Sequence, residues 1–184
     1  MKKSEQIYVA LFRGINVGGN NKVEMKKLKT TFETLGFKDI ATYINSGNVV
    51  FKSKPKAASA LSSTIEDAVR RDFDLDLKIL VKDLPSIEAI NKVLPTHWVK
   101  DKTMRTDVMF LWEEFDTPES LELMQLKEVD NILYAPGALL CNIMDKDYDQ
   151  SGMIKMIGSK LYKNMTIRNV NTFRKLLEMM REME

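Results

Sequence analysis

The chain has 184 residues, of which 44% are apolar and 29% charged, and its formal net charge is +2. This composition is typical of a soluble globular protein with one large domain or two small ones. The single cysteine, Cys141, excludes an internal disulfide, and the single histidine, His97, excludes a multi-histidine metal site. No apolar run approaches the roughly 18 residues of a membrane span. Because the N-terminus also lacks the apolar core of a signal peptide, we expect a cytoplasmic protein without membrane contact.

The first 83 residues show the order β-α-β-β-α-β. One predicted helix follows apolar residues spaced from Met25 to Leu35 and ends at Gly36, with Asn21 and Glu24 placed as a capping box. Pro55 is expected to open a second helix that reaches Phe73. Short β-branched and aromatic runs predict strands over 7–12, 40–44, 49–51 and 77–82. The order is that of a ferredoxin-like fold, a four-stranded antiparallel sheet with two helices on one face.

The second half repeats this order less clearly. A linking helix is predicted over 84–93, and the amphipathic spacing of Phe173, Leu176, Leu177 and Met180 predicts a final helix. Between them we expect strands over 106–112, 129–135 and 138–144, a helix opened by Pro118, and helical structure over 150–161. The predicted fold class is therefore α+β, with two tandem ferredoxin-like (α/β-plait) subdomains, antiparallel sheets and a C-terminal helix. The expected subdomains are residues 1–83 and 84–184.

The segment RGINVGGNNK at 13–22 is the most unusual in the chain. It follows a strand and precedes a helix, where backbone amides and the helix dipole favour an anion. Eight of its ten residues are basic, glycine or asparagine and could contact a ligand, namely Arg13, Gly14, Asn16, Gly18, Gly19, Asn20, Asn21 and Lys22. The loop lacks both the Walker lysine and the G-x-G-x-x-G spacing, which argues against a conventional nucleotide triphosphatase or Rossmann site. An anion site and a purely structural connection remain equally compatible with it.

Two further polar segments are candidates for the same site. The hairpin turn is formed by Asn45, Ser46, Gly47 and Asn48, for which turn chemistry alone is a sufficient explanation. Near the other end of the chain, Arg168 and Asn169 precede the final helix. Helix capping explains an asparagine there but does not explain the arginine.

Candidates for catalysis or metal binding are few. Cys141 lies in an apolar strand and is typical of a packed thiol, and His97 follows a helix. The alternating Asp145, Asp147 and Asp149 favour a solvated acidic loop, because the glycine and distal glutamate of a calcium-binding loop are missing. We therefore predict neither a metal nor a cofactor.

In RNA-recognition modules of this fold, exposed aromatic side chains on the two central strands stack on bases. Tyr8 and Phe12 are placed to share one face of the first strand, but the third strand adds only Phe51. This pattern weakens the case for sequence-specific RNA recognition.

Three separated motifs, RGINVGGNNKVEM, TYINSGNVVF and TIRNVNTFRKLLE, resemble the bacterial domain-of-unknown-function 1697 family. The resemblance runs from about Tyr8 to Leu177 and implies a cytosolic protein with two α/β-plait subdomains. It implies no reaction, because the family has no assigned activity. One departure is visible: the family usually reads Arg-Asn-Trp where this chain has Arg168, Asn169 and Val170.

The leading hypothesis is a binding protein for an anionic ligand, either a nucleotide-like metabolite or a nucleic acid, with its site at the 13–22 loop. The alternatives are an enzyme with a metal-free polar site in a cleft between the subdomains, or a structural or partner-binding protein. We expect a monomer or a weak homodimer.

Overall fold

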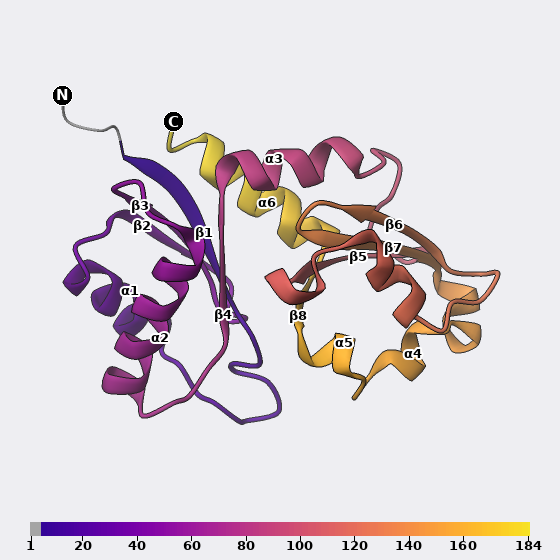
Figure 1. Ribbon diagram of the computed structural model, residues 1–184, viewed down its shortest axis with the longest axis horizontal. Coiled ribbons are helices and arrows are strands. Elements are labelled where there is room, and N and C mark those ends of the chain that lie inside the picture. Colours follow the sequence, from indigo (N-terminus) through magenta and orange to yellow (C-terminus); the bar gives the residue numbers. More distant parts are fainter. Residues whose placement is uncertain (1–4) are drawn as a thin grey trace. The chain divides into compact units, whose positions relative to one another are not determined.

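The computed structural model describes residues 5–184, which form two compact units (Figure 1). The first unit comprises Met1–Pro85 and Leu176–Glu184, and the second comprises Ser86–Lys175. The first boundary lies two residues beyond the expected division at residue 83. The segment Leu176–Glu184, which the sequence assigned to the second subdomain, groups instead with the first unit. Among residues 5–184, every helix is too short or too polar to cross a membrane.

The first unit follows the predicted order of elements. They are β1 (Gln6–Phe12), α1 (Met25–Thr34), β2 (Lys38–Tyr43), β3 (Asn48–Ser53), α2 (Ala58–Phe73) and β4 (Ile79–Asp83). The strands are ordered β2-β3-β1-β4 and every neighbouring pair is antiparallel. This is the ferredoxin-like arrangement that the β-α-β-β-α-β order predicts.

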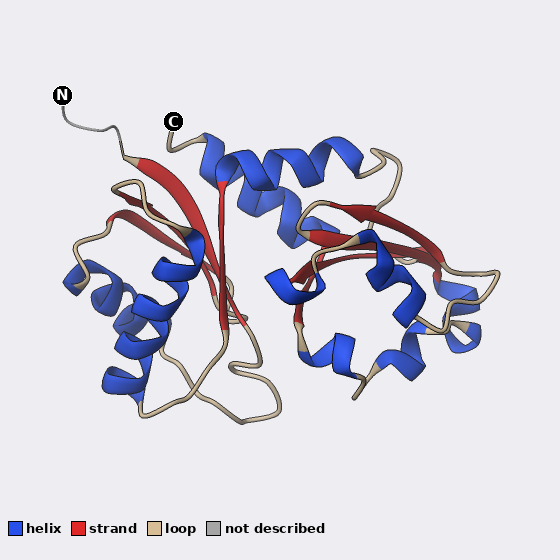
Figure 2. Ribbon diagram, in the orientation of Figure 1, coloured by secondary structure: helices blue, strands red, loops and turns tan. Residues whose placement is uncertain are grey.

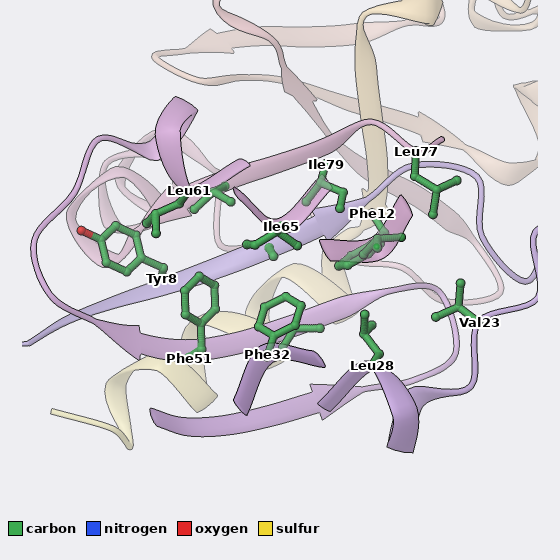
Figure 3. Packing of buried hydrophobic residues seen from close by; sticks show 14 of the residues in the cluster. Tyr8, Phe12, Val23, Leu28, Phe32, Phe51, Leu61, Ile65, Leu77 and Ile79 are labelled. Carbon is green, nitrogen blue, oxygen red and sulfur yellow. The ribbon is translucent and has the colours of Figure 1, made fainter. Parts of the chain in front are cut away.

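Aromatic side chains fill the core between this sheet and its helices (Figure 3). Tyr8 and Phe12 are four positions apart on β1, so their side chains point to the same face of the sheet. Phe51 on β3 pairs with Tyr8 on that face. The ring of Phe51 lies 5.7 Å from that of Tyr8 and 5.3 Å from that of Phe32 on α1. Tyr8, Phe12 and Phe51 are therefore core residues, at most 2% exposed, and are not available to stack on bases.

Both helices of the first unit begin later than the sequence predicts. Helix α1 starts after Glu24, so Asn21 and Glu24 form no capping box; Asn21 has a left-handed φ of 47° and its side chain bonds the carbonyl of Gly14. Helix α2 starts after Ala57 rather than at Pro55. The reason lies in Lys56, whose backbone N–H and carbonyl both bond the Tyr8 hydroxyl and hold this stretch outside the helix.

The second unit has the same strand order with much shorter helical elements. Its strands are β5 (Met104–Leu111), β6 (Asn131–Ala135), β7 (Ala138–Met144) and β8 (Met165–Asn169), in the antiparallel order β6-β7-β5-β8. Its sheet therefore repeats the β2-β3-β1-β4 pattern of the first. Helices α3 (Leu84–Val93) and α6 (Val170–Arg181) coincide with the predicted linking and final helices and extend across the unit boundaries.

The helical segments expected between the strands of the second unit are broken into short turns (Figure 2). The helix opened by Pro118 is a 3-10 segment, η2 (Pro118–Leu123), which follows another, η1 (Glu113–Phe115). The region 150–161 contains the end of η3 (Asp145–Gln150), α4 (Met153–Met156) and the start of α5 (Lys160–Lys163). Gly158, with φ of 89°, follows α4, and the Ser159 hydroxyl caps α5, so one continuous helix cannot form.

Candidate functional site

The 13–22 loop is a folded segment with two apolar anchors. Ile15 and Val23 are at most 4% exposed and belong to the core of the first unit. Between them, the Asn20 N–H donates to the Val17 carbonyl at 3.0 Å. The two residues inside this small hairpin, Gly18 and Gly19, have φ of 57° and 80°, which is the type I′ geometry that glycine adopts without strain. Its tip is exposed to solvent.

Two of the three asparagines bond the loop's own backbone. The Asn16 side chain accepts from the Val23 N–H at 2.8 Å and donates to the Val23 carbonyl at 3.0 Å. The Asn21 amide donates to the Gly14 carbonyl at 2.9 Å. Asn16 and Asn21 therefore shape the loop, whereas Asn20 lies at its exposed tip.

The loop and the hairpin turn at 45–48 are in direct contact. The Asn16 amide donates to the Asn45 carbonyl at 2.8 Å, and the Phe12 N–H donates to the Gly47 carbonyl at 2.9 Å. Gly47 packs so closely that a Cβ atom there would lie 2.5 Å from that of Phe12. The Asn48 amide closes the turn by donating to the Ser46 hydroxyl and the Tyr43 carbonyl, both at 3.0 Å.

A cavity of about 560 Å³ opens where this loop, the turn and the N-terminus of α1 meet. The Leu28 N–H donates to the carbonyl of Glu24, the N-cap residue of α1, at 2.9 Å, and the Glu24 side chain makes no capping hydrogen bond. The N–H groups of that turn carry the positive end of the helix dipole. The lining combines two lysines, two asparagines and one carboxylate, and consists of Asn16, Gly19, Lys22, Val23, Glu24, Met25, Lys26 and Asn45.

The sequence predicted only part of this lining. Asn16, Gly19, Lys22 and Asn45 were expected at the site, but Lys26 was not. The available signal was its position in the first turn of the predicted helix, next to the loop. Arg13 lies at the start of the loop, half-buried, and its backbone N–H bonds the Lys78 carbonyl at 3.1 Å.

A second cavity, of about 500 Å³, lies at the opposite end of the same sheet. Among residues 5–184, three carboxylates, those of Glu5, Asp83 and Glu184, line it with one cation, Lys52. This balance does not favour an anion, so the cavity beside the 13–22 loop is the better anion site.

Arg168 and Asn169 belong to the second unit, whereas the loop and the turn belong to the first. Arg168 is 7% exposed, and burial lowers its pKa to about 10. Its Nη1 donates to the Thr166 hydroxyl at 3.0 Å and to the Ile167 carbonyl at 2.8 Å. The Asn169 side chain accepts a hydrogen bond from the Thr172 N–H at 2.9 Å. This is the helix-capping role that was one of its two predicted roles.

The second unit also contains the two side chains considered for nucleophilic chemistry. Cys141 is buried, and burial, with the nearby Asp107 carboxylate, raises the pKa of its thiol to about 12. His97 is exposed to solvent. A buried thiol that stays protonated at neutral pH is a packing residue rather than a nucleophile. Within residues 5–184, no three His, Cys, Asp or Glu side chains are grouped so that they could hold a metal ion.

The chain belongs to a family of uncharacterised proteins. The sequence profile described as "Protein of unknown function (DUF1697)" matches residues 6–140, which confirms the family that the sequence resembled. No curated protein matches the chain. Among solved structures, it is similar to the conserved bacterial protein SP0830 from Streptococcus pneumoniae, with 27% identity and a TM-score of 0.83. The match covers 96% of this chain and 99% of that one.

Proposed function

We propose that this protein binds an anionic ligand, a nucleotide-like metabolite or a nucleic acid, at the cavity beside the 13–22 loop. One observation carries the proposal: Lys22 of the loop and Lys26 of the first turn of α1 line the same cavity as the N-terminus of that helix, where the Glu24 side chain makes no capping bond. Backbone N–H groups at a helix N-terminus are ready donors to phosphate oxygens, and Lys22 and Lys26 add charge. The cytoplasmic location and the state of monomer or weak homodimer expected from the sequence are part of this proposal.

The internal bonds of the loop support this proposal, because they hold the site in shape before any ligand arrives. The Asn16 side chain bonds Val23, the residue that follows the loop, and Asn45 in the neighbouring turn. A binding site that is already ordered loses less conformational entropy on binding. Glu24 also lines the cavity and opposes an anion, so we expect the ligand to bond the backbone and lysine side of the cavity.

The test is a thermal-shift titration of the purified chain with nucleotides, sugar phosphates and short single-stranded RNA and DNA. A ligand at 100 times its Kd stabilises a protein by about 2.7 kcal/mol, which raises the Tm of a chain of this size by roughly 5–10 °C. The double variant Lys22→Ala/Lys26→Ala should lose this shift, and Glu24→Gln should increase it. Lys54→Ala removes the same kind of charge at the opposite end of the sheet, beyond β3, and should leave the shift unchanged.

The dependence on salt separates the two ligand classes. With a nucleic acid, log affinity falls with log salt by about 0.7–0.9 for each phosphate contacted, whereas a mononucleotide gives a shallower slope. The proposal fails if no anion raises the Tm, or if Lys54→Ala weakens binding as much as the double variant does.

A further inference from the structure

Two segments of opposite charge run side by side in the second unit. Residues 113–126 contain five acids and no base, and residues 150–163 contain three lysines and no acid. A Cβ atom on Gly152 would lie only 1.7 Å from the Gln125 carbonyl oxygen. At the other end, the Lys160 ammonium lies 5.4 Å from the centre of the Phe115 ring. Because position 152 meets 125 and position 160 meets 115, the two segments are antiparallel neighbours.

Each segment turns one methionine inward and aliphatic side chains outward. Met124 and Met156 share the buried core of the second unit. Four large aliphatic side chains of the same two segments remain exposed, here called the outer patch: Leu123 (56%), Leu126 (37%), Ile154 (38%) and Ile157 (65%). These four side chains lie on two neighbouring segments, and contiguous exposed apolar surface marks sites of interaction with other molecules.

Four charged side chains beside the outer patch are not joined in ion pairs. Within residues 5–184, Glu119, Glu122, Lys155 and Lys163 enter no ion pair, and all four are exposed. The surface therefore has an acidic strip from 113–122, a basic strip from 155–163 and exposed aliphatic residues on both segments.

We propose that the outer patch is a self-association surface for a second copy of this chain. A two-fold axis that runs along the seam between the strips places the acidic strip of each copy over the basic strip of the other. The same rotation brings the two outer patches together. A uniformly acidic peptide or an anionic membrane fits the lysines but is repelled by the acidic strip, so only a partner with both charges satisfies the whole surface. A second copy has both.

An interface limited to this surface is small, so the dimer is weak and forms only at high protein concentration. This inference does not rest on the proposed anion site, which lies in the other unit. Sedimentation velocity on the full chain, from about 1 µM to several hundred µM, tests it. We expect the apparent mass to rise from 21.2 kDa towards twice that value.

Substitutions on the surface give the decisive comparison. Ile157→Glu should abolish the rise in mass. Glu122→Lys and Lys155→Glu should each weaken association by about tenfold, because each places like charges opposite one another across the two-fold axis. The double variant Glu122→Lys/Lys155→Glu should restore it. Ile44→Asp changes a half-exposed residue of the first unit, at a positive φ that aspartate tolerates, and should associate as the unmodified chain does.

The inference is wrong if the unmodified chain stays monomeric throughout, or if the double variant associates no better than the two single variants. Cosedimentation with vesicles containing phosphatidylserine tests whether the surface binds a membrane instead. A monomeric chain that binds these vesicles, and loses that binding on Ile157→Glu, would assign the surface to a membrane instead.

Discussion

The side-chain amide of Asn16 donates to the backbone carbonyl of Asn45 across 2.8 Å, and this bond joins the 13–22 loop to the hairpin turn before β3. The same side chain bonds both the N–H and the carbonyl of Val23. A single asparagine thus fixes the entry to the loop, its exit and the neighbouring turn.

Replacement of Asn16 should destabilise the first unit in a way that separates side-chain bonds from backbone strain. Asn16→Gly keeps the positive φ of 53° and loses the three bonds, so we expect a loss of about 1–2 kcal/mol. Asn16→Ala loses the same bonds and adds a left-handed alanine, at a further cost of about 1 kcal/mol. Equilibrium unfolding in urea measures both. Equal stability of Asn16→Gly and the unmodified chain would show that these bonds add nothing.

Gly47 and Gly18 have similar backbone angles but different surroundings. Gly47→Ala places a Cβ atom 2.5 Å from Phe12 and 2.6 Å from Ile15, with φ of 76°. We expect it to cost about 2–4 kcal/mol through strain and overpacking together. Gly18→Ala has φ of 57° with no atom within 4 Å, so strain alone should cost about 1–2 kcal/mol. A smaller loss for Gly47→Ala than for Gly18→Ala, in thermal or urea unfolding, would contradict this account.

Asn169 has two proposed roles, which one pair of substitutions can separate. Asn169→Ala removes the cap on α6 and should cost about 1 kcal/mol in urea unfolding. Asn169→Asp keeps the cap and places a negative charge at a helix N-terminus, so the free energy of unfolding should stay close to that of the unmodified chain. An anion titration of Asn169→Asp then isolates the binding role. Retained affinity would restrict Asn169 to capping, and weakened affinity at full stability would place it at the ligand.

Burial of Cys141 predicts both its reactivity and a dependence of stability on pH. Because its pKa is raised to about 12, the native thiol should resist a disulfide reagent at pH 8 and react fully once the chain is unfolded in urea. The unfolded thiol loses its proton from about pH 9, whereas the folded one keeps it. This group therefore stabilises the fold below pH 9 and loses that contribution as the pH rises towards 12.

The control for this prediction is Cys141→Val, which fills the same site without a titrating group. Its free energy of unfolding should fall less steeply between pH 9 and 12 than that of the unmodified chain. Parallel pH profiles, or rapid modification of the native thiol, would mean that Cys141 is more accessible than its 4% exposure indicates.

Local patterns predicted the first unit well because its elements are long enough to show their periodicity. The run from Met25 to Leu35 has helical spacing and Gly36 follows it, so the helix was predicted, although the capping box proposed at Asn21 placed its start too early. The errors at Asn21 and Pro55 have different causes. Asn21 bonds the Gly14 carbonyl within its own loop instead of capping the helix, whereas the residue after Pro55, Lys56, is held by the Tyr8 hydroxyl 48 positions away. In the second unit, Pro118 indicated the start of a helical segment but could not distinguish a full helix from a short 3-10 segment.

The candidate site was predicted in part for the same reason. The unusual composition of 13–22 identified the loop, and two of its polar residues, Asn16 and Lys22, line the cavity. The sequence could not show that Asn16 and Asn21 would bond the loop's own backbone, because an asparagine serves a ligand or a carbonyl equally well. Nor could it show that Ile15, in a polar stretch, is an anchor of the core.

The sequence by itself determined the order of the strands and helices, the repeat of one β-α-β-β-α-β pattern and the family to which the chain belongs. These depend on residues close together in the chain and on their spacing. Only the tertiary structure decided that Asn45 meets the 13–22 loop, that 150–163 lies along 113–126, and that Leu176–Glu184 groups with the first unit. Those relationships join residues 27 or more positions apart, where packing and hydrogen bonding select one arrangement among many that the local pattern allows.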